Sequence, residues 1–237
     1  MEDFKFFGRR KGRKIRKAKT SLLERFLPQL NIDGSDEISP ALFSVPVDKI
    51  WLEIGFGGGE HLSGVSQLYP HTGFIGAEVF QNGIANLLSL ITGIKQNSDL
   101  PENITLLPNR VDNIRIFSDD VRKLFARIPD GLLDGVFLLF PDPWPKKRHA
   151  DRRFINPENL SELARIIRKG GTLFIATDHP VYKRWTLEKI YHSEDFVWTA
   201  QKSSDWRNPP SDWIETKYQQ KALKEGRRPV FLNYRRL

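Results

Sequence analysis

Short apolar runs recur along most of the chain and alternate with longer stretches in which apolar residues return every three or four positions. Such short runs are typical of buried strands, and the longer spacing is typical of amphipathic helices. Strands are predicted at Ile50–Ile54, Phe74–Glu78, Ile114–Phe117, Gly135–Phe140, Thr172–Thr177, Phe196–Thr199 and Val230–Tyr234. Helices are predicted near Ser21–Leu27, Glu60–Leu68, Gln81–Thr92, Val121–Ala126, Pro157–Ile167 and Val181–Ile190. The alternation indicates an α/β fold, with a mostly parallel sheet and helices on both faces.

The composition is that of a globular protein, with 39% hydrophobic residues among 237. We expect a single domain over residues 20–237, in which residues 93–113 form a long surface connection. The absence of cysteine excludes disulfides, thiolate metal sites and a cysteine nucleophile, and we expect no metal. No apolar run is long enough to span a membrane, and the N-terminus lacks the apolar segment of a secretory signal. We therefore expect a cytoplasmic protein.

Positive charge is concentrated at the N-terminus. The chain has a formal charge of +8, and residues 1–19 hold nine Lys or Arg against Glu2 and Asp3. Such a segment buries too little apolar surface to fold alone, so we expect a flexible arm that binds a polyanion, with nucleic acid favoured. An anionic membrane surface and a solvated tail are the alternatives. Phe4, Phe6 and Phe7 could pack on the protein body or stack on bases.

A glycine-rich turn follows the first predicted strand and opens a helix. Gly55, Gly57 and Gly59 lie in the segment Glu53-Ile54-Gly55-Phe56-Gly57-Gly58-Gly59-Glu60. Glycine lets the backbone approach a ligand closely, and the following helix offers free N–H groups, so the turn suits a nucleotide-like ligand. The Gly-Lys-Ser/Thr sequence that holds a triphosphate is missing here, which argues against a nucleoside triphosphate as the ligand.

Acidic residues end or follow the first three strands. Glu78 can accept hydrogen bonds from both ribose hydroxyls, and Asp119 is placed to bond an adenine amino group. Glu53 precedes the first glycine, where its charge would oppose a pyrophosphate but suit a sulfonium and an α-amino group. This favours S-adenosylmethionine as the cofactor. Alternatively, Glu53 is an internal salt-bridge partner, and Asp119 or Asp120 caps a helix.

The segment Phe140-Pro141-Asp142-Pro143-Trp144 follows an apolar strand, at the end of a sheet where ligands bind. Prolines on both sides stiffen the loop that presents Asp142, although a proline-rich turn with a solvated Asp is the alternative. Trp144 could stack on a base or pack in the core. The neighbouring basic residues are expected to contact phosphates: Lys146, Lys147, Arg148, His149, Arg152 and Arg153.

These segments, together with Gly76-Ala77-Glu78-Val79, Arg152-Arg153-Phe154, Ala176-Thr177-Asp178 and Thr216-Lys217-Tyr218, resemble the bacterial tRNA (guanine-N7)-methyltransferase family from about Phe43 to the C-terminus. The resemblance implies a Rossmann-like class I methyltransferase, with a mostly parallel seven-stranded sheet and an antiparallel last strand. It implies methylation of a guanosine at N7 in the tRNA variable loop, at position 46 in standard tRNA numbering.

The resemblance also implies site residues. Glu53, Glu78, Asp119 and Asp142 match the family's cofactor and active-site acids, beside the glycines of the turn. Substrate-binding positions are matched by Lys146, Asp178, Thr216, Lys217, Tyr218 and Gln219. Two departures stand out: residues 93–113 are longer than the usual connection, and Gln219 replaces an expected glutamate.

The chemistry needs little beyond alignment. Guanine N7 already carries a lone pair, so attack on the sulfonium methyl requires no strong base. Asp142 can hold the guanine N1–H and exocyclic amine, or it can stabilise developing positive charge. Two other functions stay open: methylation of an exocyclic amino group, whose usual motif has adjacent prolines, and a non-catalytic RNA-binding module.

Overall fold

The computed structural model describes residues 7, 8, 10, 12, 14–34, 36–94 and 112–237. The chain divides into two compact units, which are described separately. The N-terminal unit spans Arg9–Arg127, and the C-terminal unit comprises Met1–Gly8 and Ile128–Leu237. Most of the connection expected at residues 93–113 lies outside the described residues, and the single domain over residues 20–237 stays a prediction.

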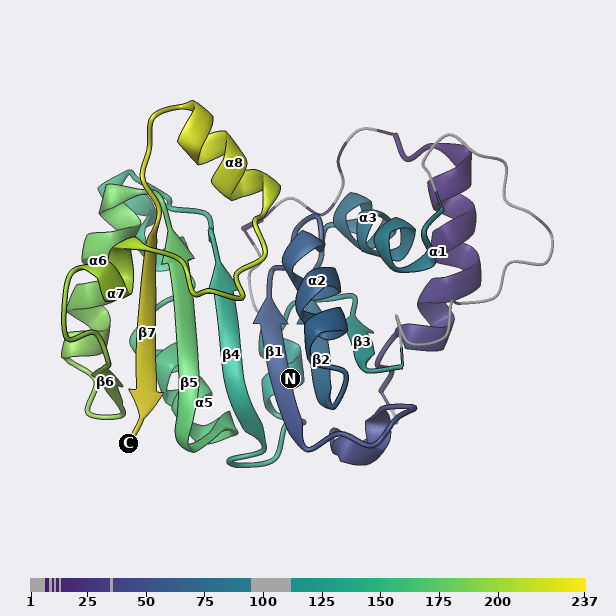
Figure 1. Cartoon of the computed structure of the whole chain (residues 1–237), viewed down its shortest axis with the longest axis horizontal. Coiled ribbons are helices and arrows are strands. Elements are labelled where there is room, and N and C mark those ends of the chain that lie inside the picture. The colour runs from purple at the N-terminus through teal and green to yellow at the C-terminus, as the bar shows by residue number, and fades with distance from the viewer. Residues whose placement is uncertain (1–6, 9, 11, 13, 35, 95–111) are drawn as a thin grey trace. The chain divides into compact units, whose positions relative to one another are not determined.

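The N-terminal unit contains three parallel strands in the order β3-β2-β1. They are β1 (Lys49–Ile54), β2 (Thr72–Ala77) and β3 (Ile114–Phe117). Its helices are α1 (Lys17–Leu30), α2 (Glu60–Leu68), α3 (Gln81–Thr92) and α4 (Arg122–Phe125), with a short 3-10 turn, η1 (Pro40–Leu42). In Figure 1, α2 lies over β2, and α1 lies beside α3. Leu52, Leu62, Ile75 and Leu87 are fully buried between strands and helices, which fixes the strand ends relative to α2 and α3.

The C-terminal unit contains four strands in the order β4-β5-β7-β6. They are β4 (Leu133–Leu139), β5 (Ile167–Thr177), β6 (Phe196–Trp198) and β7 (Val230–Arg236). β4 and β5 are parallel, whereas β7 is antiparallel to both β5 and β6. The helices are α5 (Pro157–Ile166), α6 (Pro180–Tyr191), α7 (Ser204–Arg207) and α8 (Lys217–Lys224), with the 3-10 helix η2 (Lys147–Arg152). In Figure 1, α8 lies beyond the carboxyl ends of β4 and β5.

All seven predicted strands occur in the described residues, with the predicted parallel strands and the antiparallel last strand. Two predicted boundaries differ most from the structure. The first helix starts at Lys17, so the last residues of the expected arm are helical. β5 starts at Ile167, because the polar Arg168–Gly170 segment continues the strand rather than a turn. Helices α7 and α8 had no predicted counterparts. Among the described residues, no helix is both long and apolar enough to cross a bilayer.

An aromatic cluster fixes the chain before α8. Trp213 packs on Phe231 of β7, with ring centroids 5.1 Å apart, and on Phe174 of β5 at 5.8 Å. Leu139 at the end of β4 belongs to the same buried cluster. Because aromatic rings bury large apolar areas, this cluster anchors α8 near the strand ends that it overlies.

Candidate functional site

The glycine turn of the N-terminal unit has the backbone shape that its sequence predicts. Gly55, Gly57 and Gly59 all have positive φ, at 68°, 53° and 75°. A Cβ placed on Gly55 would meet no atom within 4 Å, so the turn is open at that residue. Gly59 is the N-cap residue of α2, so the turn leads directly into the positive end of the helix dipole.

Glu78 follows β2 directly, and its carboxylate ties the glycine turn to the chain after β2. Gly57 N–H donates to Oε2 over 2.7 Å, and Val79 N–H and Phe80 N–H donate to Oε1 over 2.9 Å each. Burial raises the pKa of Glu78, and these hydrogen bonds oppose that rise. A carboxylate has about four acceptor sites, so Oε2 retains capacity for one ligand hydroxyl.

Glu53 lies in β1 and is almost fully buried. Its Oε2 is 2.8 Å from Nδ1 of His61 in α2, and both side chains are shielded from solvent. The contact with His61 agrees with the alternative interpretation, in which Glu53 is an internal salt-bridge partner. The predicted contact with a sulfonium or α-amino group stays a prediction.

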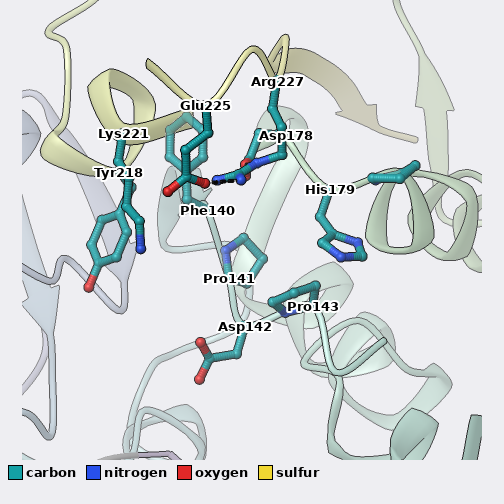
Figure 2. Close-up of a pocket in the computed structure, with 11 residues that line it drawn as sticks. Phe140, Pro141, Asp142, Pro143, Asp178, His179, Tyr218, Lys221, Glu225 and Arg227 are labelled. Carbon is teal, nitrogen blue, oxygen red and sulfur yellow. Dashed lines mark hydrogen bonds and ion pairs between the residues drawn. The ribbon is translucent and has the colours of Figure 1, made fainter. Parts of the chain in front are cut away.

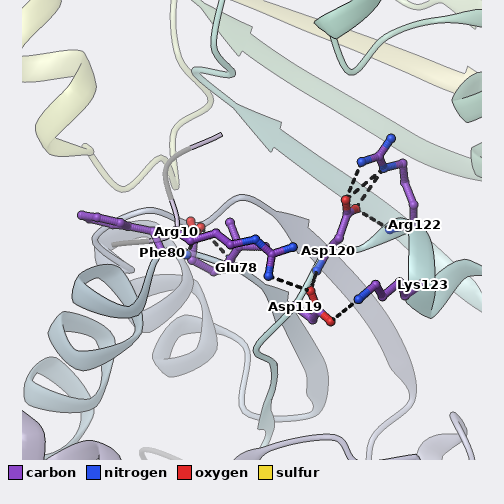
Figure 3. A network of polar contacts seen from close by, with 8 residues as sticks. Arg10, Glu78, Phe80, Asp119, Asp120, Arg122 and Lys123 are labelled. Carbon is purple, nitrogen blue, oxygen red and sulfur yellow. Dashed lines mark hydrogen bonds and ion pairs between the residues drawn. The ribbon is translucent and has the colours of Figure 1, made fainter. Parts of the chain in front are cut away.

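Asp119 and Asp120 follow β3 and have different roles (Figure 3). Asp120 is buried, accepts from the N–H of Arg122 at the start of α4 at 3.0 Å and pairs with the Arg122 guanidinium. Asp119 is half-exposed and pairs with Lys123 at 2.6 Å and Arg10 at 3.7 Å. Partial burial opposes ionisation of Asp119, but these cations and Asp120 N–H together lower its pKa. Adenine binding by Asp119 would therefore compete with Arg10.

Part of the predicted arm contacts the start of α3 within the N-terminal unit. Gln81 N–H donates to the carbonyl of Arg10, and Gly12 N–H donates to Asn82 Oδ1 over 3.0 Å. A Cβ on Gly12 would lie 2.9 Å from the Phe80 ring, so the backbone approaches this ring closely. Sequence reasoning missed these contacts because charge dominates the composition of the segment.

The loop after β4 presents Asp142 in the C-terminal unit. Phe140 and Trp144, on either side of it, are the non-glycine residues of the described chain with positive φ, at 51° and 38°. Such conformations cost free energy and persist where the surrounding structure enforces them, often at functional sites. The prolines and this backbone strain together hold Asp142 exposed at the surface of a pocket of about 420 Å³.

Three carboxylates line this pocket, and two of them are paired (Figure 2). Arg227 binds Asp178 at 2.5 Å and also pairs with Glu225. The bond to Asp178, followed by that to Glu225, raises the pKa of Arg227. Asp142 forms no hydrogen bond or salt bridge with another described residue. Its carboxylate is therefore the one that stays available to a ligand.

The segment around the start of α8 brings one of the predicted substrate residues to the pocket, leaves one exposed outside the pocket lining and buries two others. Tyr218 lines the pocket and Lys217 is exposed, whereas Thr216 and Gln219 are buried. Thr216 Oγ1 caps the helix by accepting Gln219 N–H at 3.1 Å, and Gln219 Oε1 accepts from Trp213 Nε1. Thr216 and Gln219 thus hold α8 in place, and the Thr-x-x-Gln spacing is a capping signal that could have predicted this helix.

Sequence reasoning did not assign four of the residues that line the pocket: His179, Lys221, Glu225 and Arg227. They come from the start of α6, from α8 and from the chain before β7. No sequence motif joins these segments, so only the fold reveals that they share a pocket.

The basic residues near Asp142 divide into two groups. Lys146, Lys147 and Arg148 are exposed, as a phosphate-binding role requires. Arg153 was wrongly placed in that group: it is buried, donates to the carbonyls of Pro143 and Trp144, and stacks on Trp185. Its hydrogen bonds stabilise the conformation of the Asp142 loop.

The rings near the loop are also engaged. Trp144 is not among the pocket-lining residues; Arg152 covers its ring and His149 meets it edge to face. Partial desolvation and the charges of Arg152, Arg148 and Lys146 lower the pKa of His149. A neutral imidazole at physiological pH is therefore expected.

Comparisons with known proteins agree over nearly the whole chain. The methyltransferase family Methyltransf_4 matches residues 48–232. A tRNA (guanine-N(7)-)-methyltransferase of Rhodospirillum rubrum is 45% identical, with 99% of this chain and 89% of the relative covered. One of Bartonella quintana is 41% identical, with 97% and 94% covered. The 16S rRNA (adenine(1408)-N(1))-methyltransferase of Catenulisporales acidiphilia has a similar fold, with a TM-score of 0.52, 14% identity, and 87% and 94% of the chains covered. The matched residues include the glycine turn and the Asp142 loop.

Proposed function

The chain belongs to the tRNA (guanine-N7)-methyltransferase family, and we propose that it transfers the methyl group of S-adenosylmethionine to N7 of a guanosine in the tRNA variable loop, at position 46. The observation that carries this proposal is Asp142, the pocket carboxylate without a protein partner among the described residues. Cytoplasmic tRNA is the substrate that we propose. The strained, proline-flanked loop supports a functional role for Asp142, because a solvated turn would not need such a backbone.

The residues of the N-terminal unit fit S-adenosylmethionine. The open glycine turn at Gly55 gives a ligand room, and the positive end of the α2 dipole suits its carboxylate. Glu78 fixes the turn and can accept one ribose hydroxyl. Glu53, paired with His61, contributes negative charge beneath a cationic ligand. S-adenosylmethionine supplies the electrophilic methyl group.

In the C-terminal unit, Asp142 would accept hydrogen bonds from the guanine N1–H and exocyclic amine, which orients the base by its Watson–Crick edge. Guanine N7 attacks with its ring lone pair, so no residue has to remove a proton first. Methylation leaves positive charge on the base, and a nearby carboxylate stabilises that charge more in the transition state than in the ground state. Asp142 therefore both positions guanine and favours the transfer.

The pocket also suits an extruded nucleotide. A base in folded tRNA is stacked and paired, so an enzyme must take it out of the stack to reach it. Tyr218 lines the pocket, is about half-exposed at 54%, and can stack on a base. Exposed Lys146 and Lys147 can bind the flanking phosphates.

The test replaces Asp142 with asparagine, which keeps the size of the side chain but loses the charge and one acceptor oxygen. We expect Asp142→Asn to bind S-adenosylmethionine normally and to lose roughly 10²–10³-fold in single-turnover rate at saturating tRNA, the typical effect of removing one transition-state contact. Nucleoside mass spectrometry identifies the product, and sequencing of the modified tRNA gives its position.

Asp151→Asn is the matched control, because Asp151 is an exposed acid of the neighbouring 3-10 helix. It should keep the wild-type rate. A normal rate in Asp142→Asn would contradict the catalytic role of Asp142. Methylation of an exocyclic amine in place of N7 would overturn the proposed reaction and favour the other class of methyltransferase.

A further inference from the structure

His61 of α2 is among the most deeply buried polar residues of the N-terminal unit, and its partner is a candidate cofactor-site acid. The side chain of His61 is 3% exposed and that of Glu53 is 2% exposed, with Nδ1 of His61 2.8 Å from Oε2 of Glu53. An ionised carboxylate only accepts hydrogen bonds, so Nδ1 carries a proton and donates it. His61 is the second residue of α2, where the helix dipole disfavours an added positive charge. Its position therefore suits a hydrogen-bond donor rather than a counter-charge.

Close packing of α2 on the sheet explains why His61 reaches Glu53. Glu53 of β1 lies opposite Gly76 of β2 in the parallel ladder, so the two residues face the same side of the sheet. A Cβ on Gly76 would lie 2.4 Å from Cδ2 of Leu62, so the glycine lets α2 approach the strands closely. Leu62 is fully buried at this point. The helix thereby brings the preceding residue, His61, to the carboxylate of Glu53.

The contact with His61 uses only one of the two carboxylate oxygens of Glu53. Within the described residues, Oε1 of Glu53 has no hydrogen-bond donor, and Glu53 stands two positions before the open turn at Gly55. The charge of Glu53 also acts on the neighbouring acid. Burial raises the pKa of Glu78 most, its backbone hydrogen bonds oppose the rise, and the charge of Glu53 adds to it. Negative charge gathered beside the glycine turn favours a ligand with a cationic group.

We propose that His61 is a positioning residue for cofactor binding: its hydrogen bond to Oε2 holds the Glu53 carboxylate ionised, with Oε1 directed to the cationic methionyl part of S-adenosylmethionine. This inference rests on the proposed function, which supplies the cofactor. A buried carboxylate that loses its donor takes up a proton or turns to another donor, because an unpaired buried charge is costly. In either case the sulfonium and α-amino groups of the cofactor lose their anionic partner.

The test compares two ligands that differ in the part that Glu53 would bind. S-adenosylmethionine carries the sulfonium and α-amino cations, whereas 5′-methylthioadenosine keeps the adenosine and the sulfur but carries neither charge. Isothermal titration measures both affinities with the full chain. His61→Leu removes the donor and keeps a buried side chain of similar size. His61→Asn is the matched control, because its amide nitrogen lies as many bonds from the backbone as Nδ1 does.

We expect His61→Leu to bind S-adenosylmethionine roughly 10- to 100-fold more weakly, the range for one hydrogen bond to a charged group, with an unchanged affinity for 5′-methylthioadenosine. His61→Asn should recover most of the loss. Chemical denaturation without ligand checks that each variant is folded. Equal losses for both ligands would overturn the proposal, since His61 would then only support the shape of the turn. Wild-type affinity for S-adenosylmethionine in His61→Leu would overturn it as well.

A double-substitution cycle tests the same proposal even if His61→Leu alone fails to fold. Glu53→Gln removes the charge, and the double variant Glu53→Gln/His61→Leu removes the buried pair together, which costs less than leaving one partner unpaired. Because His61 acts through Glu53, the double variant should bind S-adenosylmethionine as weakly as Glu53→Gln and no more weakly. A further loss in the double variant would contradict the proposal. The proposed function fails separately: in that case the wild-type protein itself would form no 7-methylguanosine in tRNA.

Discussion

Replacing Glu78 with glutamine tests how the N-terminal unit holds its cofactor turn. The carboxylate accepts three backbone N–H groups: Gly57 at 2.7 Å, and Val79 and Phe80 at 2.9 Å each. An amide has one oxygen, so Glu78→Gln can keep the two bonds at Oε1 only by turning its NH2 group toward Gly57 N–H. Two donors then face each other at the centre of the glycine turn.

The size of the effect follows from that one lost bond. A buried donor without an acceptor costs about 1–3 kcal/mol, which corresponds to a roughly 5- to 150-fold weaker affinity if the turn must be re-formed when the cofactor binds. The stability of the fold should change less, because the substitution also removes a buried charge. Weakened S-adenosylmethionine binding with a modest stability change is therefore the expected signature of Glu78→Gln.

Isothermal titration with S-adenosylmethionine measures the affinity, and Glu24→Gln, at an exposed position of α1, is the control. Chemical denaturation at several pH values adds a second readout. Because burial raises the pKa of Glu78 above its ordinary value of 4.5, its contribution to stability is greatest below that pH and is lost as pH rises through the raised pKa. The stability of Glu78→Gln should not show this decline as pH rises. Wild-type affinity together with an unchanged pH profile would refute the reasoning.

Two further predictions concern the substrate side. Removing residues 1–16 leaves α1 whole and should lower the salt slope of tRNA binding by roughly 3–4 units if about four arm cations reach phosphates; equal slopes would mean that the arm is a solvated tail. Arg227→Gln should raise KM for tRNA in steady-state kinetics more than it lowers kcat, because Asp178 and Glu225 then face the phosphates as unpaired charges. An unchanged KM would show that these acids stay away from the RNA.

The strands could be predicted from the sequence because each is an apolar run bounded by turn residues. The predicted bounds of β3, α2 and α3 were correct to the residue. Helix α8 was not predicted because it is polar on most of its surface and is held by only a few buried side chains, Gln219 and Ala222 among them. The start of β5 was not predicted because the exposed residues Arg168 and Lys169 are typical of a loop, although the backbone there continues the strand.

The strand-end acids could be located for a topological reason, but their partners could not. Ligands bind where parallel strands end, so the positions of Glu78 after β2 and of Asp142 after β4, each in its own unit, could be located from the strand pattern alone. Whether an acid is free or engaged depends on what the fold brings beside it. Glu53 meets His61 from the next helix, and Asp178 meets Arg227 from a segment 49 positions further along the chain.

Arg152 and Arg153 show where prediction from sequence ends. They are identical residues in adjacent positions, and any argument from charge assigns both to phosphate. The chain leaves η2 at Arg152, so the two side chains point to different surroundings. One enters the protein and donates to two carbonyls of the loop; the other is partly exposed, with its guanidinium over the rings of Phe7 and Trp144. The first determines the shape of the Asp142 loop and the second its affinity for anions, so replacing each by lysine should affect folding in one case and salt-dependent binding in the other.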